Sequence, residues 1–141
     1  MLLFASALEF VAKKIKMKNL IIDAAADKIF FKIIIDNKSY TSDYPNSREN
    51  FEKLTILLFN FLLENSVKIE EINNIFINQG PGKFSGIRSS IAVAKALSFT
   101  NEANLYGFDA KDAKDQKYDK ILDLFNKGLL TKNLIKPQYS S

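Results

Sequence analysis

The segment NQGPGKFSGIRSS, residues 78–90, places three glycines within seven residues and a basic side chain shortly after them. The glycines are Gly80, Gly82 and Gly86, and the basic residue is Arg88. A strand pattern precedes this loop and a helical pattern follows it, which is the context in which backbone N–H groups bind anions. The spacing matches neither the P-loop nor the Gly-x-Gly-x-x-Gly fingerprint. Spacing alone therefore favours a tight strand-to-helix turn, in which Gly86 lets the helix approach a sheet closely.

Asp23 ends the first predicted strand, where a carboxylate could bind a metal ion or have a purely structural role. A two-metal nuclease needs several convergent carboxylates, and Asp109, after the last predicted strand, is a possible second one. The segment after Asp23, Ala24–Ala26, offers no hydroxyl to a phosphate. Arg88 could bind a partner's carboxylate, a phosphate or a carboxylate of this chain. Residue type and position alone do not decide between these alternatives for Asp23 and Arg88.

Composition narrows the chemistry further. The 141 residues contain no cysteine and no histidine, which excludes disulfides, thiolate chemistry, histidine-ligated zinc and every Ser-His-Asp triad. The formal net charge of +4 permits contact with nucleic acid but does not argue for it. Any catalysis would depend on carboxylates, lysine, arginine, hydroxyls or an oxygen-bound metal.

The first sixteen residues are treated as an N-terminal extension, either a short helix or a start-site artefact. The run MLLFASALEFVA is too short to span a bilayer, and its positive charges follow the apolar stretch, the reverse of a secretory signal. Met17, just before a strand pattern, is a second possible start. The expected compartment is the cytoplasm.

The elements that position these residues begin with three strands. NLIID, KIFFKIIID and SYTSDY (residues 19–23, 28–36 and 39–44) are rich in β-branched and aromatic residues and predict an antiparallel meander. Further strands are expected at 73–78 and 104–108, a helix at 84–99, and a last helix beginning near Asp109 and stopped by Gly128. The order β-β-β-α-β-α-β-α predicts an α/β fold of the ribonuclease H-like or actin-like (ASKHA) class, with a mixed five-stranded sheet and flanking helices.

The first long helix is predicted at residues 46–65, with Asn46 as its cap and Glu49 in the capping-box position. Its apolar residues exceed the single stripe needed to pack on a sheet, and a helix apolar on most sides requires burial on most sides. Together with Arg88, this helix is therefore the predicted partner interface. The predicted interface residues are Phe51, Leu54, Ile56, Leu57, Leu58, Phe59, Phe61 and Leu62, with Leu63 extending the same apolar surface.

GPGKFSGIR resembles the Gly-Pro-Gly-Ser-Phe-Thr-Gly-Leu/Val-Arg signature of the bacterial TsaB (YeaZ) family, which takes part in making threonylcarbamoyladenosine in tRNA. IIDAAAD, SREN, AVAKALSF and LYGFDA resemble neighbouring segments of that family, so the resemblance covers roughly residues 17–110. The motif residues that carry it are Gly80, Pro81, Gly82, Lys83, Phe84, Ser85, Gly86, Ile87 and Arg88.

The resemblance implies a non-catalytic subunit, similar in fold to the catalytic subunit TsaD and joined to it through helices of the N-terminal domains. The family is also called glycoprotease or peptidase M22-like. Without histidine, this chain lacks the ligands for the catalytic subunit's metal, so we expect no catalytic residue, no metal and no cofactor. Expected partners are a TsaD-like subunit and a TsaE-like ATPase, with indirect or weak tRNA contact and no membrane contact. The alternatives are an actin-like phosphotransferase, a ribonuclease H-like nuclease using Asp23, or an inactive homodimer.

Departures from the family pattern weaken nucleotide binding. Ala24, Ala25 and Ala26 replace hydroxyl residues, Gln79 stands where arginine is usual, and Lys83 replaces a small serine. Residues 17–110 are expected to form an actin-like N-terminal domain. Residues 111–141 are expected to form a C-terminal helix and tail, the remnant of a second domain.

Overall fold

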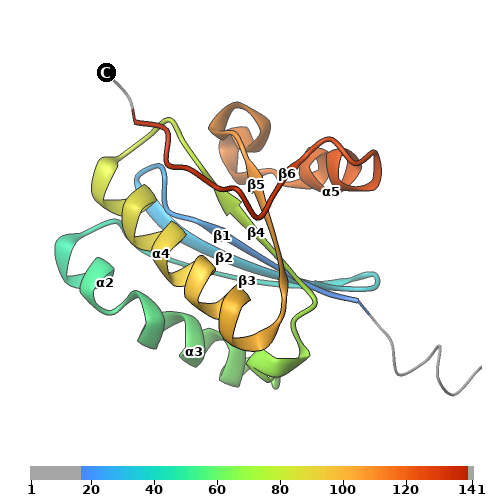
Figure 1. The fold of residues 1–141 in the computed structure, drawn as a ribbon. Coiled ribbons are helices and arrows are strands. Elements are labelled where there is room, and N and C mark those ends of the chain that lie inside the picture. Colours follow the sequence, from blue (N-terminus) through green and yellow to red (C-terminus); the bar gives the residue numbers. More distant parts are fainter. Residues whose placement is uncertain (1–16, 140–141) are drawn as a thin grey trace, which may run out of the picture.

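A six-stranded mixed sheet lies at the centre of the computed structural model, which describes residues 17–139. The strands run in the spatial order β3-β2-β1-β4-β5-β6, so the first strand of the chain is central (Figure 1). The predictions for residues 1–16 lie outside the described residues. The strands are β1 (Lys18–Asp23), β2 (Lys28–Ile35), β3 (Lys38–Pro45), β4 (Asn74–Asn78), β5 (Asn104–Phe108) and β6 (Thr131–Lys132).

The pairing confirms the predicted antiparallel meander of β1, β2 and β3. β4 and β5 then add in parallel to β1, so the carboxyl ends of β1, β4 and β5 meet at one edge of the sheet. The five predicted strands are present, and β6 adds a sixth by pairing antiparallel with β5 through Thr131 and Lys132. The prediction of five strands was therefore wrong, because a strand as short as β6 cannot show an alternating apolar pattern.

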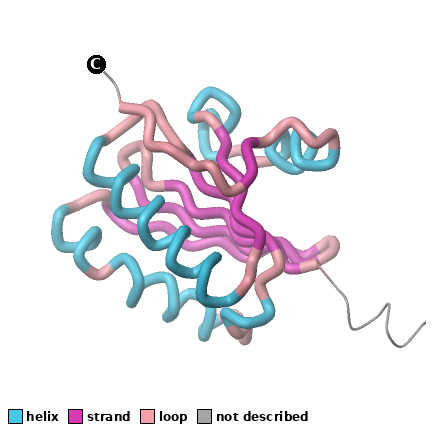
Figure 2. Tube along the Cα trace, in the orientation of Figure 1, coloured by secondary structure: helices cyan, strands magenta, loops and turns pink. Residues whose placement is uncertain are grey.

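Helices cover both faces of the sheet, as Figure 2 shows by the cyan coils on either side of the magenta strands. Alternate residues of β1 point to opposite cores: Leu20 and Ile22 belong to the core beneath α3 and α4, and Ile21 to the core beneath α5. The unbroken apolar run of β1 follows from burial on both faces. The helical segments are α2 (Arg48–Glu52), α3 (Leu54–Glu64), η1 (Ile69–Glu71), α4 (Phe84–Asn101), η2 (Ala110–Gln116) and α5 (Asp119–Asn126).

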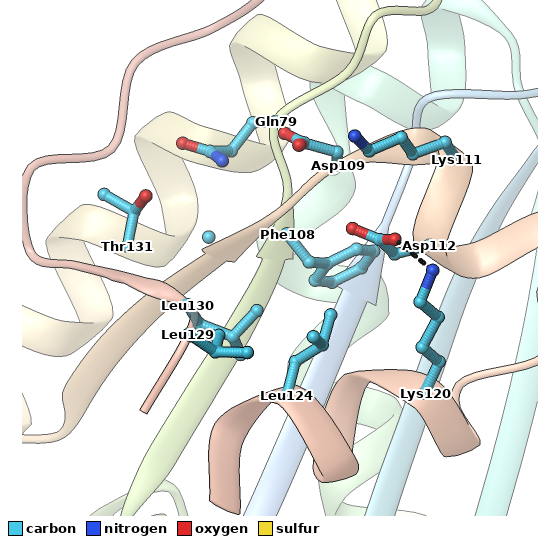
Figure 3. A pocket seen from close by; sticks show the side chains of 11 residues that line it. Gln79, Phe108, Asp109, Lys111, Asp112, Lys120, Leu124, Leu129, Leu130 and Thr131 are labelled. Atoms are coloured by element: carbon cyan, nitrogen blue, oxygen red, sulfur yellow. Dashed lines mark ion pairs between the residues drawn. The ribbon is translucent and has the colours of Figure 1, made fainter. Parts of the chain in front are cut away.

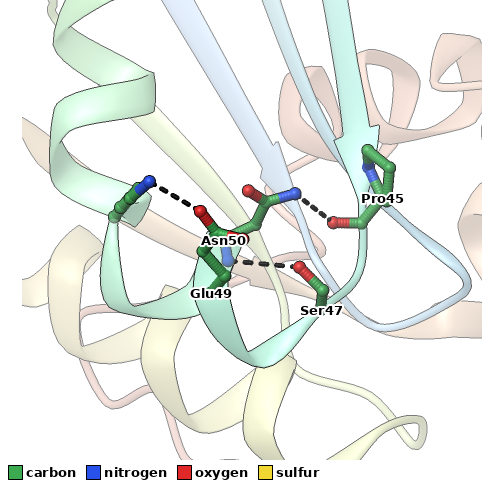
Figure 4. A network of polar contacts seen from close by, with 5 residues as sticks. Pro45, Ser47, Glu49 and Asn50 are labelled. Carbon is green, nitrogen blue, oxygen red and sulfur yellow. Dashed lines mark hydrogen bonds and ion pairs between the residues drawn. The ribbon is translucent and has the colours of Figure 1, made fainter.

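The helix predicted at residues 46–65 is two helices, α2 and α3, that meet at Lys53. Its N-cap is Ser47 rather than Asn46: the Ser47 hydroxyl accepts a hydrogen bond from the Asn50 backbone N–H at 3.2 Å (Figure 4). The Asn46 side chain is directed elsewhere: its Nδ2 donates to the carbonyl oxygens of Ala24, at 3.2 Å, and Ala26, and its Oδ1 accepts no hydrogen bond from the described residues. The capping-box prediction was therefore wrong.

The predicted last helix also breaks in two. Its first half is the distorted η2, in which Ala113, Lys114 and Asp115 have non-helical backbone angles. Its second half, α5, ends as expected at Gly128, which has a φ of +69°. The distortion lets Tyr118 turn into the core, where its ring stacks on Phe30 with centroids 5.3 Å apart. Tertiary packing of one aromatic ring thus overrides a continuous helical pattern.

Candidate functional site

The candidate site lies at the carboxyl ends of β1 and β4, where Asp23 and Asn78 meet. Asp23 is only 6% exposed. Its Oδ1 accepts hydrogen bonds from the Ala25 backbone N–H (3.2 Å) and Asn78 Nδ2 (3.0 Å). Its Oδ2 accepts one from the Tyr118 hydroxyl at 2.9 Å. The carboxylate is therefore held on both oxygens by groups of this chain.

Burial sets the electrostatics of this pair. Desolvation raises the pKa of Asp23, and the hydrogen bonds from Ala25, Tyr118 and Asn78 act in the opposite direction. The pKa of Tyr118 is raised by its burial and by the adjacent Asp23 charge, so the hydroxyl stays a donor. A donor fixed on a buried carboxylate stabilises the fold at this position.

A cavity of about 550 Å³ lies beside Asp23 and is lined also by Ala25, Ala26, Asn78 and Pro81. Asp109, the predicted second carboxylate, does not line this cavity; its Oδ1 accepts from Gln138 Nε2 at 3.3 Å. Within residues 17–139, no three His, Cys, Asp or Glu side chains are grouped so that they could hold a metal ion. Asp23 and Asp109 thus line different cavities.

Two backbone N–H groups of the glycine loop, those of Gly80 and Lys83, are used within the chain. The Gly80 N–H donates to Asn78 Oδ1 at 2.8 Å, and the Lys83 N–H donates to the Ala25 carbonyl oxygen at 2.9 Å. The Lys83 ammonium pairs with Asp27 at 3.0 Å, which ties the loop to the turn after β1. These N–H groups are therefore unavailable to a phosphate in this conformation.

Gly82 and Gly86 allow a backbone approach that a side chain would block. A Cβ on Gly82 would overlap the carbonyl oxygen of Ala25, and one on Gly86 would overlap that of Ala24. This confirms the predicted role of Gly86, with the chain directly after β1 as the element that approaches. Ala24 is itself fully buried in the core. The small alanine side chains of the segment after β1 thus lie against glycines of the loop, and this combination permits the close approach of the two backbones.

Sequence reasoning missed the contact of the C-terminal tail with this loop. The Gln138 backbone N–H donates to the Gln79 carbonyl oxygen at 2.7 Å, and the Tyr139 and Phe84 rings lie 4.6 Å apart. Upstream, Ile135 is fully buried in the core beneath α3 and α4. The tail had no periodic pattern, and its one available signal was the Pro-x-Tyr sequence around Gln138.

Arg88 is exposed on the second turn of α4, with its guanidinium carbon 5.9 Å from the centre of the Phe84 ring. It forms no ion pair with any residue between 17 and 139. The intrachain ion pair considered for it is therefore absent from the described part of the chain. Its charge faces solvent beside an exposed aromatic ring.

The predicted interface helix separates into two apolar faces. Leu54, Leu58, Phe61 and Leu62, at spacing i, i+4, i+7 and i+8, are buried in the core. Four residues predicted as interface are thus core residues, because the sheet takes one stripe of α3. Phe51 and Leu57 are half-buried against the same core.

The other face of α3 stays exposed. Ile56, Phe59 and Leu63, at spacing i, i+3 and i+7, are 60%, 41% and 77% exposed. We call these three residues the α3 outer face. α3 and α4 lie in the same layer on one side of the sheet (Figure 1). Exposed apolar residues that share one side of a helix are more informative than scattered ones.

The chain resembles known proteins over most of its length. A family model described as "tRNA N6-adenosine threonylcarbamoyltransferase" (TsaD) matches residues 34–113, more than half of the chain. The "tRNA threonylcarbamoyladenosine biosynthesis protein TsaB" of Buchnera aphidicola subsp. Schizaphis graminum is 26% identical over 98 residues, covering 70% of this chain and 47% of the relative. The structure of YeaZ from Pseudomonas aeruginosa superposes with a TM-score of 0.62 at 18% identity, covering 71% of this chain and 50% of that one.

The chain belongs to the family that this model describes, and the relatives that it matches are named TsaB and YeaZ. The α/β fold is accordingly the predicted actin-like or ribonuclease H-like one. The RuvC protein of T. thermophilus, solved with a Holliday junction substrate, has the same general fold, with a TM-score of 0.57 at 8% identity over 82% of this chain and 99% of that one. This chain spans about half the length of the curated TsaB that it matches. Among residues 17–139, no helix is both long and apolar enough to cross a membrane.

Proposed function

We propose that this chain is a non-catalytic accessory subunit in threonylcarbamoyladenosine modification of tRNA, and that it binds a TsaD-like transferase. Membership of the TsaB/YeaZ family supports the process, and a place in the cytoplasm accompanies that role. The observation that carries the proposal is the α3 outer face: three apolar side chains exposed together on a helix whose opposite stripe is already buried. In this proposal residues 17–110 form the domain that binds the transferase, and Arg88 adds a charged contact to the interface.

The closed state of the strand-end site supports the non-catalytic part of the proposal. Both oxygens of Asp23 accept hydrogen bonds from this chain, and the loop N–H groups of Gly80 and Lys83 donate to Asn78 and Ala25. An enzyme of this fold would need those groups directed at its substrate. The likeness to RuvC extends to the fold alone.

Co-purification tests the interface. The chain and the TsaD-like protein of the same organism are co-expressed with a tag on one of them, and the retained partner is quantified. We expect the double variant Ile56→Asp, Phe59→Asp to lose the complex, because two desolvated carboxylates would face an apolar partner surface. Leu134→Asp, the same type of change at a leucine that is 80% exposed in the tail, is the matched control.

Two further measurements separate the alternatives. An unchanged complex with the double variant would place the interface elsewhere, and a stable dimer of the chain alone by light scattering would favour self-association. Isothermal titration with ATP and magnesium addresses the enzymatic alternative. Binding by the isolated chain that Asp23→Asn abolishes would contradict the non-catalytic assignment.

A further inference from the structure

A second cavity, of about 290 Å³, lies between the carboxyl ends of β4 and β5 and the segment around α5 (Figure 3). It shares no lining residue with the cavity beside Asp23. Its walls are of two kinds. One side carries the polar groups of Gln79, Asp109 and Lys111, and another carries the leucine side chains of Leu124 and Leu129.

Gln79 is the buried polar group of this cavity. It is only 6% exposed. Its backbone is paired, with the N–H donating to the Phe108 carbonyl oxygen at 2.9 Å. Its side-chain amide forms no hydrogen bond with any residue in the described range 17–139, although it lines the cavity. A Cβ on Gly107 would overlap the Gln79 amide group, so the glycine provides the space in which that amide lies. The amide therefore opens onto the cavity, where it can form hydrogen bonds with a ligand.

The charges at the rim are only partly compensated. Lys120 and Asp112 pair at 2.8 Å and satisfy each other. Lys111 has no ion pair with a residue in the described part of the chain. Asp109 accepts from Gln138 Nε2 on Oδ1, which leaves its second oxygen for another donor. One cation, one anion and one amide thus lie along the same rim of the cavity (Figure 3).

The remaining wall is apolar. Leu124, Leu129 and Leu130 lie together below the polar rim, with the Phe108 ring behind them (Figure 3). The volume falls at the lower end of the range of small-molecule pockets, roughly 300 to 1,000 Å³. A ligand complementary to all of these walls is small, with both a positive and a negative charge at one end and an aliphatic group at the other.

We propose that this cavity binds a free aliphatic α-amino acid. Its carboxylate is recognised by the Lys111 ammonium and the Gln79 amide N–H, and its ammonium by Asp109. Its side chain contacts Leu124 and Leu129. A peptide presents at each terminus only one of the two charges, so the site selects the free amino acid. This site is independent of the docking surface proposed above.

Ligand-observed NMR and isothermal titration with L-leucine test the proposal on the full chain. Two analogues with the same isobutyl side chain isolate the charges: 4-methylpentanoate lacks the ammonium and isopentylamine lacks the carboxylate. We expect leucine to bind and each analogue to bind at least tenfold more weakly. Leucylglycine, whose carboxylate is displaced, should bind as weakly as isopentylamine. Absence of leucine binding at millimolar concentration, or equal binding of leucine and either analogue, would overturn the proposal.

Matched variants assign the binding to this cavity. Lys111→Met and Asp109→Asn should each weaken leucine binding at least tenfold, and the asparagine retains an oxygen for Gln138 Nε2. Lys114→Met is the control, because Lys114 lines the neighbouring cavity instead. Circular dichroism verifies that the variants are folded. Leucine binding that survives both site variants, or that is weakened equally by the control, would refute the assignment.

Discussion

The hydrogen bond between Tyr118 and Asp23 offers a direct test of the closed strand-end site. Tyr118→Phe removes the hydroxyl that donates to Asp23 Oδ2 at 2.9 Å and retains the ring. Tyr118 is 2% exposed, and its ring stacks on Phe30 and lies against Phe108. Because the aromatic packing persists in phenylalanine, the change isolates a single buried hydrogen bond.

The expected decrease in the free energy of unfolding follows from the negative charge of the acceptor, the Asp23 carboxylate. A hydrogen bond to a charged group contributes about 1.5 to 3 kcal/mol, and the abandoned carboxylate oxygen stays buried. We expect the free energy of unfolding to fall by about 2 kcal/mol, which for a chain of this length lowers the melting temperature by about 6 °C. The carboxylate keeps its bonds from Ala25 and Asn78, so the fold survives the change.

The pH dependence supplies a second signature. Because the pKa of Asp23 is raised in the folded state, the native protein binds this proton more tightly than the unfolded chain does. The contribution of Asp23 to stability is therefore greatest below the ordinary aspartate pKa and is lost as pH rises through the folded-state pKa of Asp23. The Tyr118 hydroxyl lowers that pKa, so Tyr118→Phe raises it further and extends the fall to higher pH. The loss caused by the variant should thus be larger at neutral pH than at pH near 4.

Urea unfolding monitored by circular dichroism at several pH values measures both effects. Tyr106→Phe is the matched control, because its ring packs in the same core and its hydroxyl donates to no residue between 17 and 139. A double-mutant cycle with Asp23→Asn separates the pair from the rest of the site. The reasoning is refuted if Tyr118→Phe costs the same in the Asp23→Asn background, or costs no more than Tyr106→Phe.

Three further predictions concern the loop, the helix faces and the tail, each measured by urea unfolding. Gly86→Ala should cost at least about 2 kcal/mol, because its Cβ would overlap the Ala24 carbonyl oxygen, whereas Gly128→Ala, which meets nothing within 4 Å, should cost about 1 kcal/mol for its positive φ. Equal losses at the two glycines would contradict the close approach. Leu58→Ala should cost about 2 to 5 kcal/mol, while Ile56→Ala on the α3 outer face should change stability by less than about 0.5 kcal/mol. A comparable loss at Ile56 would show that the outer face is packed within the chain. Ile135→Ala should cost about 2 kcal/mol or more, and a negligible loss would mean that the tail does not hold the position described.

Much of the fold could be predicted from local patterns. The β-branched runs of β1 and β2 specified strands, and the small residues around Gly86 indicated a helix packed closely on neighbouring backbone. The motif GPGKFSGIR and its flanking segments indicate the family by residue type and spacing alone. Gly128 marked the end of α5 because its lack of a Cβ permits the positive φ that a helix end needs.

Other features depend on partners distant in sequence, which no local pattern encodes. Ser47 rather than Asn46 caps α2, while the Asn46 Nδ2 is oriented by carbonyl oxygens twenty or more residues earlier in the chain. The sequence pattern placed Tyr118 on one face of a helix, yet its hydroxyl donates a hydrogen bond to Asp23, 95 positions earlier in the chain. The apolar surplus of α3 was visible in the sequence, but only packing on the sheet decided that Leu58 is core and Phe59 is surface.

The sequence by itself determined the five longer strands, the approximate positions of the helices, the family and the absence of histidine and cysteine chemistry, because these depend on residue type and short-range spacing. The tertiary structure decided whether Asp23 is available, where the glycine-loop N–H groups donate and which side of α3 faces outward. Those outcomes are set by hydrogen bonds and burial between segments that only the folded chain brings together.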